Sequence, residues 1–166
     1  MQHIRCFAPI ENPNAHVLIL GSMPGIASLR AGQYYAHPQN LFWRIMGELV
    51  GAKPDLPYAL RIEALRAANI ALWDVLCSCA RKGSLDSDID RNTLVANDFA
   101  SFFRRHPNLT HVFFNGAKAE ECYRKHVLSS PGIPFLEYTR LPSTSPANAG
   151  IPYERKLEAW HAIIKV

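Results

Sequence analysis

The chain has 166 residues, 48% of them hydrophobic and 19% charged, a composition typical of a globular protein, and we expect residues 1–166 to form a single domain. No apolar run reaches the roughly 18 residues that a membrane-spanning helix needs, and the N-terminus lacks the apolar core of a secretory signal. The formal net charge is +4, from 18 basic and 14 acidic residues, which is compatible with a polyanionic partner but does not identify one.

Apolar or β-branched runs bounded by turn residues predict four strands, at residues 16–21, 69–75, 111–115 and 135–141. Apolar residues at helical spacing predict helices at residues 40–50, 58–68, 97–105, 117–128 and 153–164. This alternation of strands and helices is typical of an α/β fold. We expect a three-layer sandwich in which helices cover both faces of a roughly four-stranded parallel sheet.

The carboxyl ends of parallel strands meet at one edge of a sheet, where ligands of open α/β folds bind. In this chain that edge would gather the loops that follow the four strands, at residues 21–40, 74–90, 115–117 and 141–150. Two of these loops are rich in turn-forming and polar residues. One is early in the chain and one late, which suggests two sides of a single site.

The cysteines are Cys6, Cys77, Cys79 and Cys122. Only Cys77 and Cys79 are close in sequence, and a C-x-C pair does not match the ligand spacing of zinc or iron–sulfur sites. We therefore expect reduced thiols in a cytoplasmic protein that uses neither a metal nor an organic cofactor.

Five segments occur in an order shared with a known family. They are the Gly-Ser-Met-Pro-Gly turn at 21–25, the Tyr-Ala-His-Pro-Gln-Asn-Leu-Phe-Trp run at 35–43, the strand at 70–76 with Gly-Ser-Leu-Asp-Ser-Asp at 83–88, the strand at 112–116, and the Leu-Pro-Ser-Thr-Ser-Pro-Ala-Asn turn at 141–148. Together they resemble the uracil-DNA glycosylase superfamily, and within it the hypoxanthine-DNA glycosylase family most. The resemblance covers about residues 15–150 and implies the fold of that superfamily.

The chain departs from the wider superfamily at two catalytic positions. Uracil-specific members carry Asp or Asn in the first turn to activate or position water, and many carry a late His that stabilises the departing base. Here the first turn offers Ser22 and Met23, and Leu141 precedes the late Pro-Ser. The hypoxanthine family is similar in both losses, and in it the amide that opens the helix is implicated, which matches Asn40.

Asn40 is the candidate catalytic residue. Cleaving a base from deoxyribose makes an oxocarbenium-like sugar and a negatively charged leaving base, so catalysis needs donors around the base, a positioned water and an extruded nucleotide. The amide of Asn40 does not ionise, but its oxygen can orient a water and its NH₂ can hold the base or sugar. The alternative is that Asn40 is only the N-cap of the helix at 41–50, and the two roles are compatible.

Aromatic side chains near the same edge are candidates for stacking on the flipped base. Tyr35 lies in the loop before the helix, where a packing role is less automatic, and we expect it to be the stacking residue. Phe42 is a second candidate, although with Trp43 it could equally belong to the core.

Two polar side chains at strand ends are candidates for reading the base. Asp74 is at the superfamily's base-reading position, where uracil enzymes have Asn, and its carboxylate would accept a hydrogen bond from N1–H of hypoxanthine. It could instead cap a turn or pair with Arg81 or Lys82. Asn115 could donate to O6 or N7 of the base, or belong with the following glycine to a plain strand-to-helix turn.

The two turns supply candidate contacts to the base edge and to the DNA backbone. Backbone N–H groups of the first turn can bind an anionic base edge or a phosphate; its residues are Gly21, Ser22, Met23, Pro24 and Gly25. The late turn could offer hydroxyls and amides to phosphates and press its Pro and Ala into the minor groove, or be an ordinary turn; its residues are Ser143, Thr144, Ser145, Pro146, Ala147 and Asn148.

The resemblance thus implies a monofunctional DNA glycosylase of base excision repair that removes a deaminated base. We expect this base to be hypoxanthine, with uracil and xanthine as the alternatives. We expect a monomer that acts on double-stranded or single-stranded DNA, away from membranes. None of the five segments that carry the resemblance contains a lysine to form a Schiff base, so the product would be an intact strand with an abasic site. The alternatives are a silent module that binds damaged DNA and a small-molecule enzyme, which the lack of a known phosphate-binding motif disfavours.

Overall fold

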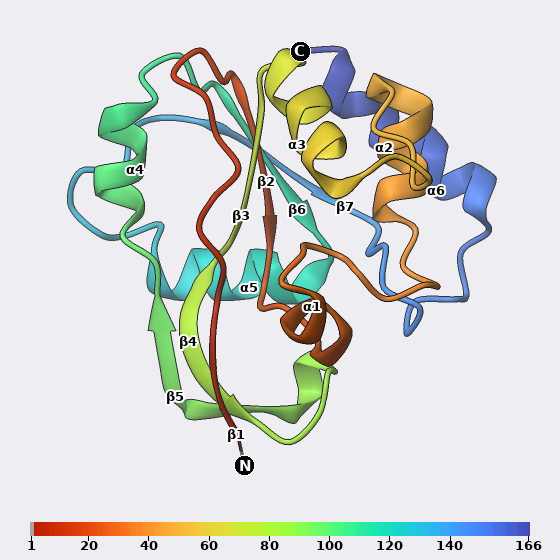
Figure 1. The fold of residues 1–166 in the computed structure, drawn as a ribbon. Helices are drawn as coiled ribbons and strands as arrows, with labels where there is room; N and C mark the ends of the chain where they lie inside the picture. Colours follow the sequence, from red (N-terminus) through yellow and green to blue (C-terminus); the bar gives the residue numbers. More distant parts are fainter. Residues whose placement is uncertain (1) are drawn as a thin grey trace.

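The computed structural model describes residues 2–166, and its centre is a four-stranded parallel sheet in the order β3-β2-β6-β7 (Figure 1). Its strands are β2 (Val17–Gly21), β3 (Ile70–Asp74), β6 (His111–Asn115) and β7 (Glu137–Leu141). The four predicted strands and their parallel arrangement are therefore confirmed. In the register of β2 and β3, Gly21 lies beside Asp74, so both end at the carboxyl edge of the sheet.

Helices cover both faces of this sheet, which confirms the predicted three layers (Figure 1). One face carries α2 (Phe42–Val50), α3 (Tyr58–Ala67) and α6 (Tyr153–Trp160), followed by the 3-10 turn η2 (His161–Ile164). The other face carries α4 (Phe99–Arg105) and α5 (Ala117–His126). The helix ends lie within two residues of the predicted ones, except that the last predicted helix is divided into α6 and η2.

Successive residues of β2 point to opposite faces of the sheet and so enter two separate cores. Val17 and Ile19 pack in the cluster that contains the aromatic residues of α2 and α6. Leu18 and Leu20 pack with the aromatic residues of α4 and α5. Because both faces are covered, all five residues of this strand are buried, and the strand is a continuous apolar run.

A second sheet was not predicted, and the expectation of a loop over residues 74–90 was wrong. The antiparallel strands β1 (Gln2–Arg5), β4 (Leu76–Arg81) and β5 (Ile89–Ala96) pair in the order β1-β4-β5. The chain passes from β3 into β4 across the single residue Val75, and the 3-10 turn η1 (Asp86–Asp88) precedes β5. The short helix α1 (Ile26–Ala31), beside the β4–β5 connection, was also missed.

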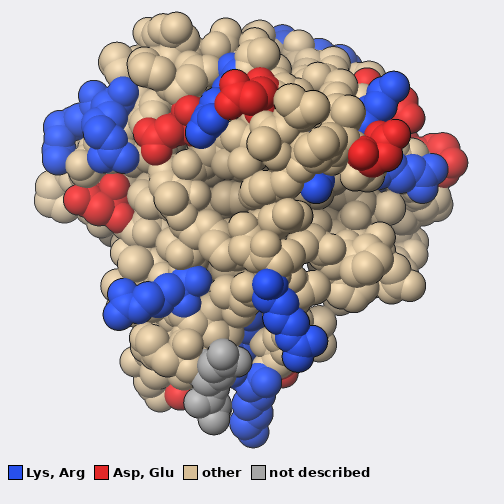
Figure 2. All heavy atoms as spheres, viewed as in Figure 1, with Lys and Arg blue, Asp and Glu red and all other residues tan. Residues whose placement is uncertain are grey.

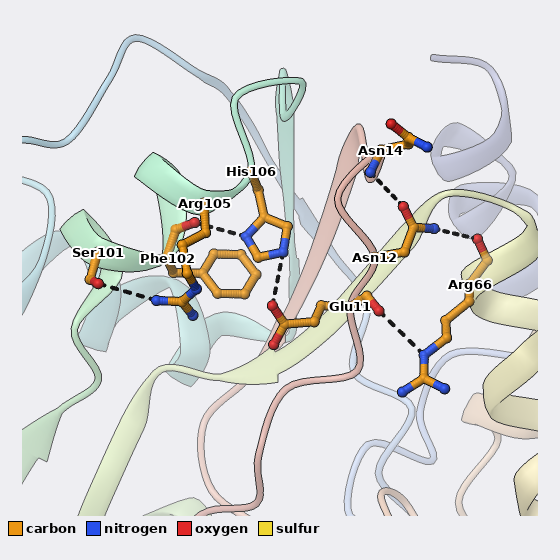
Figure 3. A network of polar contacts seen from close by, with 8 residues as sticks. All are labelled: Glu11, Asn12, Asn14, Arg66, Ser101, Phe102, Arg105 and His106. Carbon is orange, nitrogen blue, oxygen red and sulfur yellow. Dashed lines mark hydrogen bonds and ion pairs between the residues drawn. The ribbon is translucent and has the colours of Figure 1, made fainter.

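A polar network joins the segments at the amino end of the parallel sheet (Figure 3). The buried His106 ring has Nε2 3.0 Å from a carboxylate oxygen of Glu11 and Nδ1 2.8 Å from the Phe102 carbonyl oxygen. Arg66 Nε donates to the Glu11 carbonyl oxygen, and Asn12 Nδ2 donates to the Arg66 carbonyl oxygen. These contacts fasten the segment before β2 to α3 and α4, and they leave the carboxyl edge open for a site.

Three further observations concern the described residues, 2–166. In this range no helix combines the length and the apolar character needed to cross a bilayer. None of the four cysteines forms a disulfide, and burial raises the pKa of the Cys6 thiol to about 11. No group of three His, Cys, Asp or Glu side chains in the described range is placed to hold a metal ion.

Candidate active site

A cleft of about 890 Å³ lies at the carboxyl edge of the parallel sheet. The last residues of all four strands line it: Gly21, Asp74, Asn115 and Leu141. The turn after β2, the segment after β4 and the loop after β7 supply the walls. Every predicted site residue except Phe42 lines this cleft, so the structure brings together segments separated by more than 100 positions in the sequence.

The first turn is held firmly against the second sheet. The Val75 and Leu76 amides donate to the carbonyl oxygens of Gly21 and Ser22, at 2.8 and 3.2 Å. The buried guanidinium of Arg81 donates from Nη2 to the Pro24 carbonyl oxygen. Arg81, at the end of β4, therefore holds the turn of residues 21–25 in place, and the sequence did not indicate this contact.

Gly21 makes room for two candidate site side chains. A Cβ atom at this position would lie 2.6 Å from the Tyr35 hydroxyl and 2.7 Å from Asp74 Oδ1. Both distances are shorter than any tolerated contact, so only glycine allows the two polar groups to approach the end of β2 together. The Tyr35 hydroxyl and the Asp74 carboxylate thus converge at one point of the cleft.

Tyr35 lies between the cleft and the core. Its ring packs on Phe42 with centroids 4.3 Å apart and an angle of 32° between the planes. Tyr35 also lines the cleft, so its ring is a candidate contact for a ligand there. The backbone of Tyr35 has φ 53°, which few residues other than glycine adopt, and the Ser28 hydroxyl fixes the next peptide by accepting from the Ala36 amide at 3.1 Å.

Phe42 does not line the cleft, and this corrects its assignment as a base-contacting residue. Its side chain is 0% exposed and contacts Trp43 and Trp160 as well as Tyr35. The first turn of an amphipathic helix directs its apolar side chains into the core, which is the alternative that the sequence left open. Phe42 acts on the cleft only by supporting the ring of Tyr35.

Asn40 lines the cleft immediately before α2. The N-cap of α2 is Leu41, not Asn40 as the alternative expected. Asn40 Oδ1 nevertheless accepts a hydrogen bond from the Phe42 amide at 2.9 Å, so the side chain supports the start of the helix from the preceding position. Its Nδ2 makes no hydrogen bond to any of the described residues. The amide group therefore keeps two donor hydrogens and a second lone pair on the oxygen for substrate or water.

Asp74 is almost fully buried, at 3% exposure, at the end of β3. Its backbone is held in place because Asn97 Nδ2 donates to its carbonyl oxygen at 2.7 Å. Burial, and secondarily the Asp74 charge, raises the pKa of the neighbouring Tyr34 hydroxyl, so that Tyr34 remains neutral. The carboxylate is thus a buried acceptor that lines the cleft beside the end of β2.

Asn115, at the end of β6, and Thr144, in the loop after β7, make two hydrogen bonds to each other at the wall of the cleft. Asn115 Nδ2 donates to the Thr144 hydroxyl, and Asn115 Oδ1 accepts from the Thr144 amide, both at 2.9 Å. The Thr144 carbonyl oxygen accepts from the Leu41 amide at 3.0 Å. This buried threonine therefore connects β6, the late loop and the start of α2.

This pairing changes two expectations. The Thr144 side chain is 0% exposed and its hydroxyl is engaged by Asn115, so it positions the loop and does not reach a phosphate. The Asn115 amide is committed to the same contact, although Asn115 still lines the cleft and one hydrogen of its NH₂ group is not used by Thr144. The sequence could not indicate this, because the two residues are 29 positions apart.

Hydrogen bonds within the late loop and one from α6 hold the rest of this loop in place. The Ser143 hydroxyl accepts from the Ser145 amide at 3.1 Å, and the Ser145 hydroxyl accepts from the Ala147 amide at 3.2 Å. Lys156 of α6, which is buried and whose pKa burial lowers, donates to the Asn148 carbonyl oxygen at 2.6 Å. Pro146 and Ala147 are exposed at the tip.

Several lining residues were not predicted. Ser84, Leu85 and Ser87 come from the β4–β5 connection, a segment that carried part of the family resemblance but no assigned role. Lys118, from the first turn of α5, corrects the expectation that the pocket holds no lysine. Its Nζ lies 3.6 Å from a carboxylate oxygen of Glu121, and its side chain is 16% exposed.

Charge is distributed unevenly around the molecule. In the view of Figure 2, Lys and Arg side chains flank the lower part, where Figure 1 places the second sheet, while most of the visible acidic side chains lie in the upper part. Exposed basic residues of α1 and of the second sheet region include Arg5, Arg30, Lys82 and Arg91. Arg30 and Lys82 belong to segments whose neighbouring residues line the cleft, and such exposed basic side chains are suited to a polyanionic ligand.

Comparison with known proteins gives a consistent result. The family model described as the uracil DNA glycosylase superfamily matches residues 8–163. A hypoxanthine DNA glycosylase of Methanosarcina acetivorans is 36% identical over 97% of this chain and 98% of its own length, and one of Methanosarcina barkeri is 41% identical over 69% of this chain and 72% of its own.

A solved structure agrees with the sequence relatives. The solution NMR structure of a protein from Methanosarcina acetivorans, described as a candidate uracil DNA glycosylase, superposes with a TM-score of 0.80 at 36% identity. The alignment covers 99% of this chain and 98% of that one. With the fold, the cleft and the ordered motifs in agreement, the chain belongs to the uracil DNA glycosylase superfamily.

Proposed function

We propose that the protein is a DNA glycosylase that removes hypoxanthine from deoxyinosine in DNA by hydrolysis of the N-glycosidic bond. The observation that carries the proposal is the convergence of Tyr35, Asn40 and Asp74 on one cleft at the carboxyl edge of the sheet. The similarity to two hypoxanthine DNA glycosylases, over 97% of this chain for one and 69% for the other, supports the choice of base. We also propose that the protein acts as a monomer, without a metal or an organic cofactor.

The proposed reaction begins with extrusion of the nucleotide into the cleft, because the glycosidic bond cannot be reached within the base stack. Hypoxanthine stacks on the ring of Tyr35, and Asp74 accepts a hydrogen bond from N1–H. The turn of residues 21–25 supplies peptide N–H groups as candidate donors to the leaving base, on which negative charge grows. Asn40 orients the water that adds to C1′ of the sugar as the bond to the base breaks.

The function can be tested with purified protein and labelled duplexes that contain inosine, uracil, xanthine or 1,N6-ethenoadenine. We expect base release from the inosine duplex, with strand cleavage appearing only after alkali. Cleavage without alkali would indicate a lyase and would implicate Lys118. Faster release of uracil would correct the choice of base. Tight binding of inosine DNA without release would show a binding module instead of an enzyme.

Replacement of Tyr35 by Ala should reduce single-turnover excision while the fold is retained. Stacking on one base contributes roughly 1–3 kcal/mol by alanine substitution, so we expect a loss of about 5- to 150-fold. Tyr35→Phe keeps the ring and separates stacking from the contacts of the hydroxyl. Thermal unfolding of both variants gives the control, and a Tyr35→Ala protein with parental activity would refute the stacking role.

A further inference from the structure

Arg81, the last residue of β4, is a buried arginine beside the candidate site. It is 1% exposed, and among the described residues Lys156 is the one other buried Lys or Arg. Each of the two donates to a backbone carbonyl oxygen in a segment that lines the cleft, Arg81 to Pro24 and Lys156 to Asn148. Because burying a charged group is costly in free energy, the position of Arg81 calls for an explanation in the site.

The carbonyl oxygens of the first turn face the second sheet. Those of Gly21 and Ser22 accept from two backbone amides just after β3, and that of Pro24 accepts from Arg81 Nη2. Backbone amides are present whatever the side chains are, whereas no described residue except Arg81 donates to the Pro24 carbonyl oxygen. The orientation of the peptide between Pro24 and Gly25 therefore depends on one side chain.

This orientation decides where the N–H group of Gly25 points. The peptide bonds of the described chain are trans, and in a trans peptide the C=O and N–H groups point in opposite directions. Since the Pro24 carbonyl points at the buried guanidinium, the Gly25 N–H points away from it. Pro24 and Gly25 line the cleft and Arg81 does not, and no described residue accepts from this N–H. Gly25 therefore offers an available donor on the cleft side of the turn.

The next peptide of the turn is held by a different partner. The Ile26 amide donates to the Ser84 hydroxyl at 2.8 Å, and a Cβ atom on Gly25 would lie 3.6 Å from the Ser84 side chain, an ordinary contact distance. The turn is thus fixed on both sides of Gly25 by β4 and by the segment that follows it. A donor fixed in this way needs no reorganisation when charge develops beside it, and this makes it effective in catalysis.

The charge of Arg81 adds a second effect. A guanidinium stays protonated in proteins, and a hydrogen bond from an ionised donor is roughly twice as strong as one between neutral groups. Linked hydrogen bonds polarise one another, so the contact from Arg81 to the Pro24 carbonyl makes the N–H group of the same peptide a stronger donor. A stronger donor is useful where negative charge grows on a base as it leaves the sugar.

We propose that Arg81 is a positioning residue for the leaving base. Through the Pro24 carbonyl it orients and strengthens the Gly25 N–H, which donates to the departing hypoxanthine. The inference rests on the proposed function, because it concerns the negative charge that the base acquires with the electron pair of the breaking bond to C1′. Arg81 itself does not touch the substrate. Its loss should slow the chemical step more than it weakens binding of the DNA.

The test compares Arg81→Met, which fills similar space without a donor, with the parent on duplexes that contain either hypoxanthine or 8-azahypoxanthine. The extra ring nitrogen of 8-azahypoxanthine lets the base carry negative charge more easily, so its release depends less on a donor. We expect Arg81→Met to release hypoxanthine about 10- to 100-fold more slowly, short of the roughly 100- to 1,000-fold loss for a donor itself. Release of 8-azahypoxanthine should slow much less, so the ratio of the two single-turnover rates should change. Affinity for an inosine duplex with a 2′-fluoroarabino sugar, which resists hydrolysis, should change little.

Two further variants separate the positioning role from a structural one. Arg81→Lys retains the charge and a donor with a shorter reach, so its rate and its ratio should lie between those of Arg81→Met and the parent. Thr93→Val is the matched control for damage to the second sheet, because Thr93 on β5 accepts from the Ala80 amide at 2.7 Å and does not line the cleft. It should lower the melting temperature and leave both rates of the folded protein unchanged.

A folded Arg81→Met protein with the parental rate, or one that slows the release of both bases equally, would overturn the positioning role. A change of the ratio in Thr93→Val would do the same. If Arg81→Met does not fold, Arg81→Lys decides, and a parental ratio in that variant would contradict the proposal. In all these cases the parent still releases hypoxanthine, whereas a parent that releases neither base would overturn the proposed function instead.

Discussion

Replacement of Asn40 by Ala should lower the single-turnover rate of hypoxanthine release by about 100- to 1,000-fold, the loss seen when one well-placed catalytic hydrogen-bonding group is removed. The expectation rests on the place of Asn40 in the cleft and on the part of its amide that no described residue uses. Binding of inosine DNA should weaken far less than the rate, because the group acts on the water and the developing charge.

The same side chain also serves the helix, so the two contributions must be separated. Loss of the hydrogen bond from the Phe42 amide should lower the free energy of unfolding by about 1 kcal/mol and leave the rate of the folded fraction intact. Asp98 offers a matched control, because it caps α4 by accepting from the Ser101 amide at 3.1 Å and does not line the cleft. Asp98→Ala should lose similar stability and no activity.

Asn40→Asp and Asn40→Ser retain an oxygen that can cap the helix, but neither retains the NH₂ group. If the amide is catalytic, both variants should be as stable as the parent but should release hypoxanthine much more slowly. A folded Asn40→Ala variant that excises hypoxanthine at the parental rate would reduce Asn40 to a helix cap.

The parallel sheet was predictable because its signals are local. β2, β3 and β6 are short apolar runs that end in turn residues, as β2 does at Gly21 and β6 at Asn115, and the predicted helices show apolar residues at helical spacing. β7 has only Leu141 buried, and it extends the sheet by pairing with β6. The carboxyl edge then follows from parallel topology, which is why the sequence alone predicts the place of the cleft.

The second sheet was not predictable because its strands carry no local signal in the sequence. Within β5 only Ile89 is fully buried, and the strand contains Asp, Arg, Asn and Thr, so it lacks an apolar pattern. Its stability comes from pairing with β4, which in turn pairs with β1 from the other end of the sequence. Long-range pairing decides the conformation of such a segment, not local preference.

The sequence also could not predict which side chains of the site contact one another. Asn115 and Thr144 were predicted as two ligand-binding residues, and in the structure they form hydrogen bonds with each other. Phe42 looked like a stacking residue and instead supports one. In both cases the sequence indicated the correct part of the fold, and only the positions of the atoms showed which groups remain available to a substrate.

The hydrogen bond between Asp74 and N1–H of hypoxanthine predicts strong discrimination against a base without that hydrogen. The parent should release N1-methylhypoxanthine about 10,000-fold more slowly than hypoxanthine, the scale seen when a site built to bind a polar group meets an analogue that lacks it. The physical reason is that Asp74 is 3% exposed, so the methyl group would replace the donated hydrogen bond and press against a buried carboxylate in a position that water reaches poorly.

Substitution at Asp74 should remove this discrimination together with part of the rate. A hydrogen bond to a charged group contributes about 1.5–3 kcal/mol, so Asp74→Ala should release hypoxanthine roughly 10- to 150-fold more slowly than the parent and discriminate far less between the two bases. Asp74→Asn controls for shape, because it fills the same volume without the charge. Single-turnover rates of the three proteins on both substrates give the answer. A folded Asp74→Ala variant that keeps the parental ratio of the two rates would show that another group reads N1, and that Asp74 only shapes the end of β3.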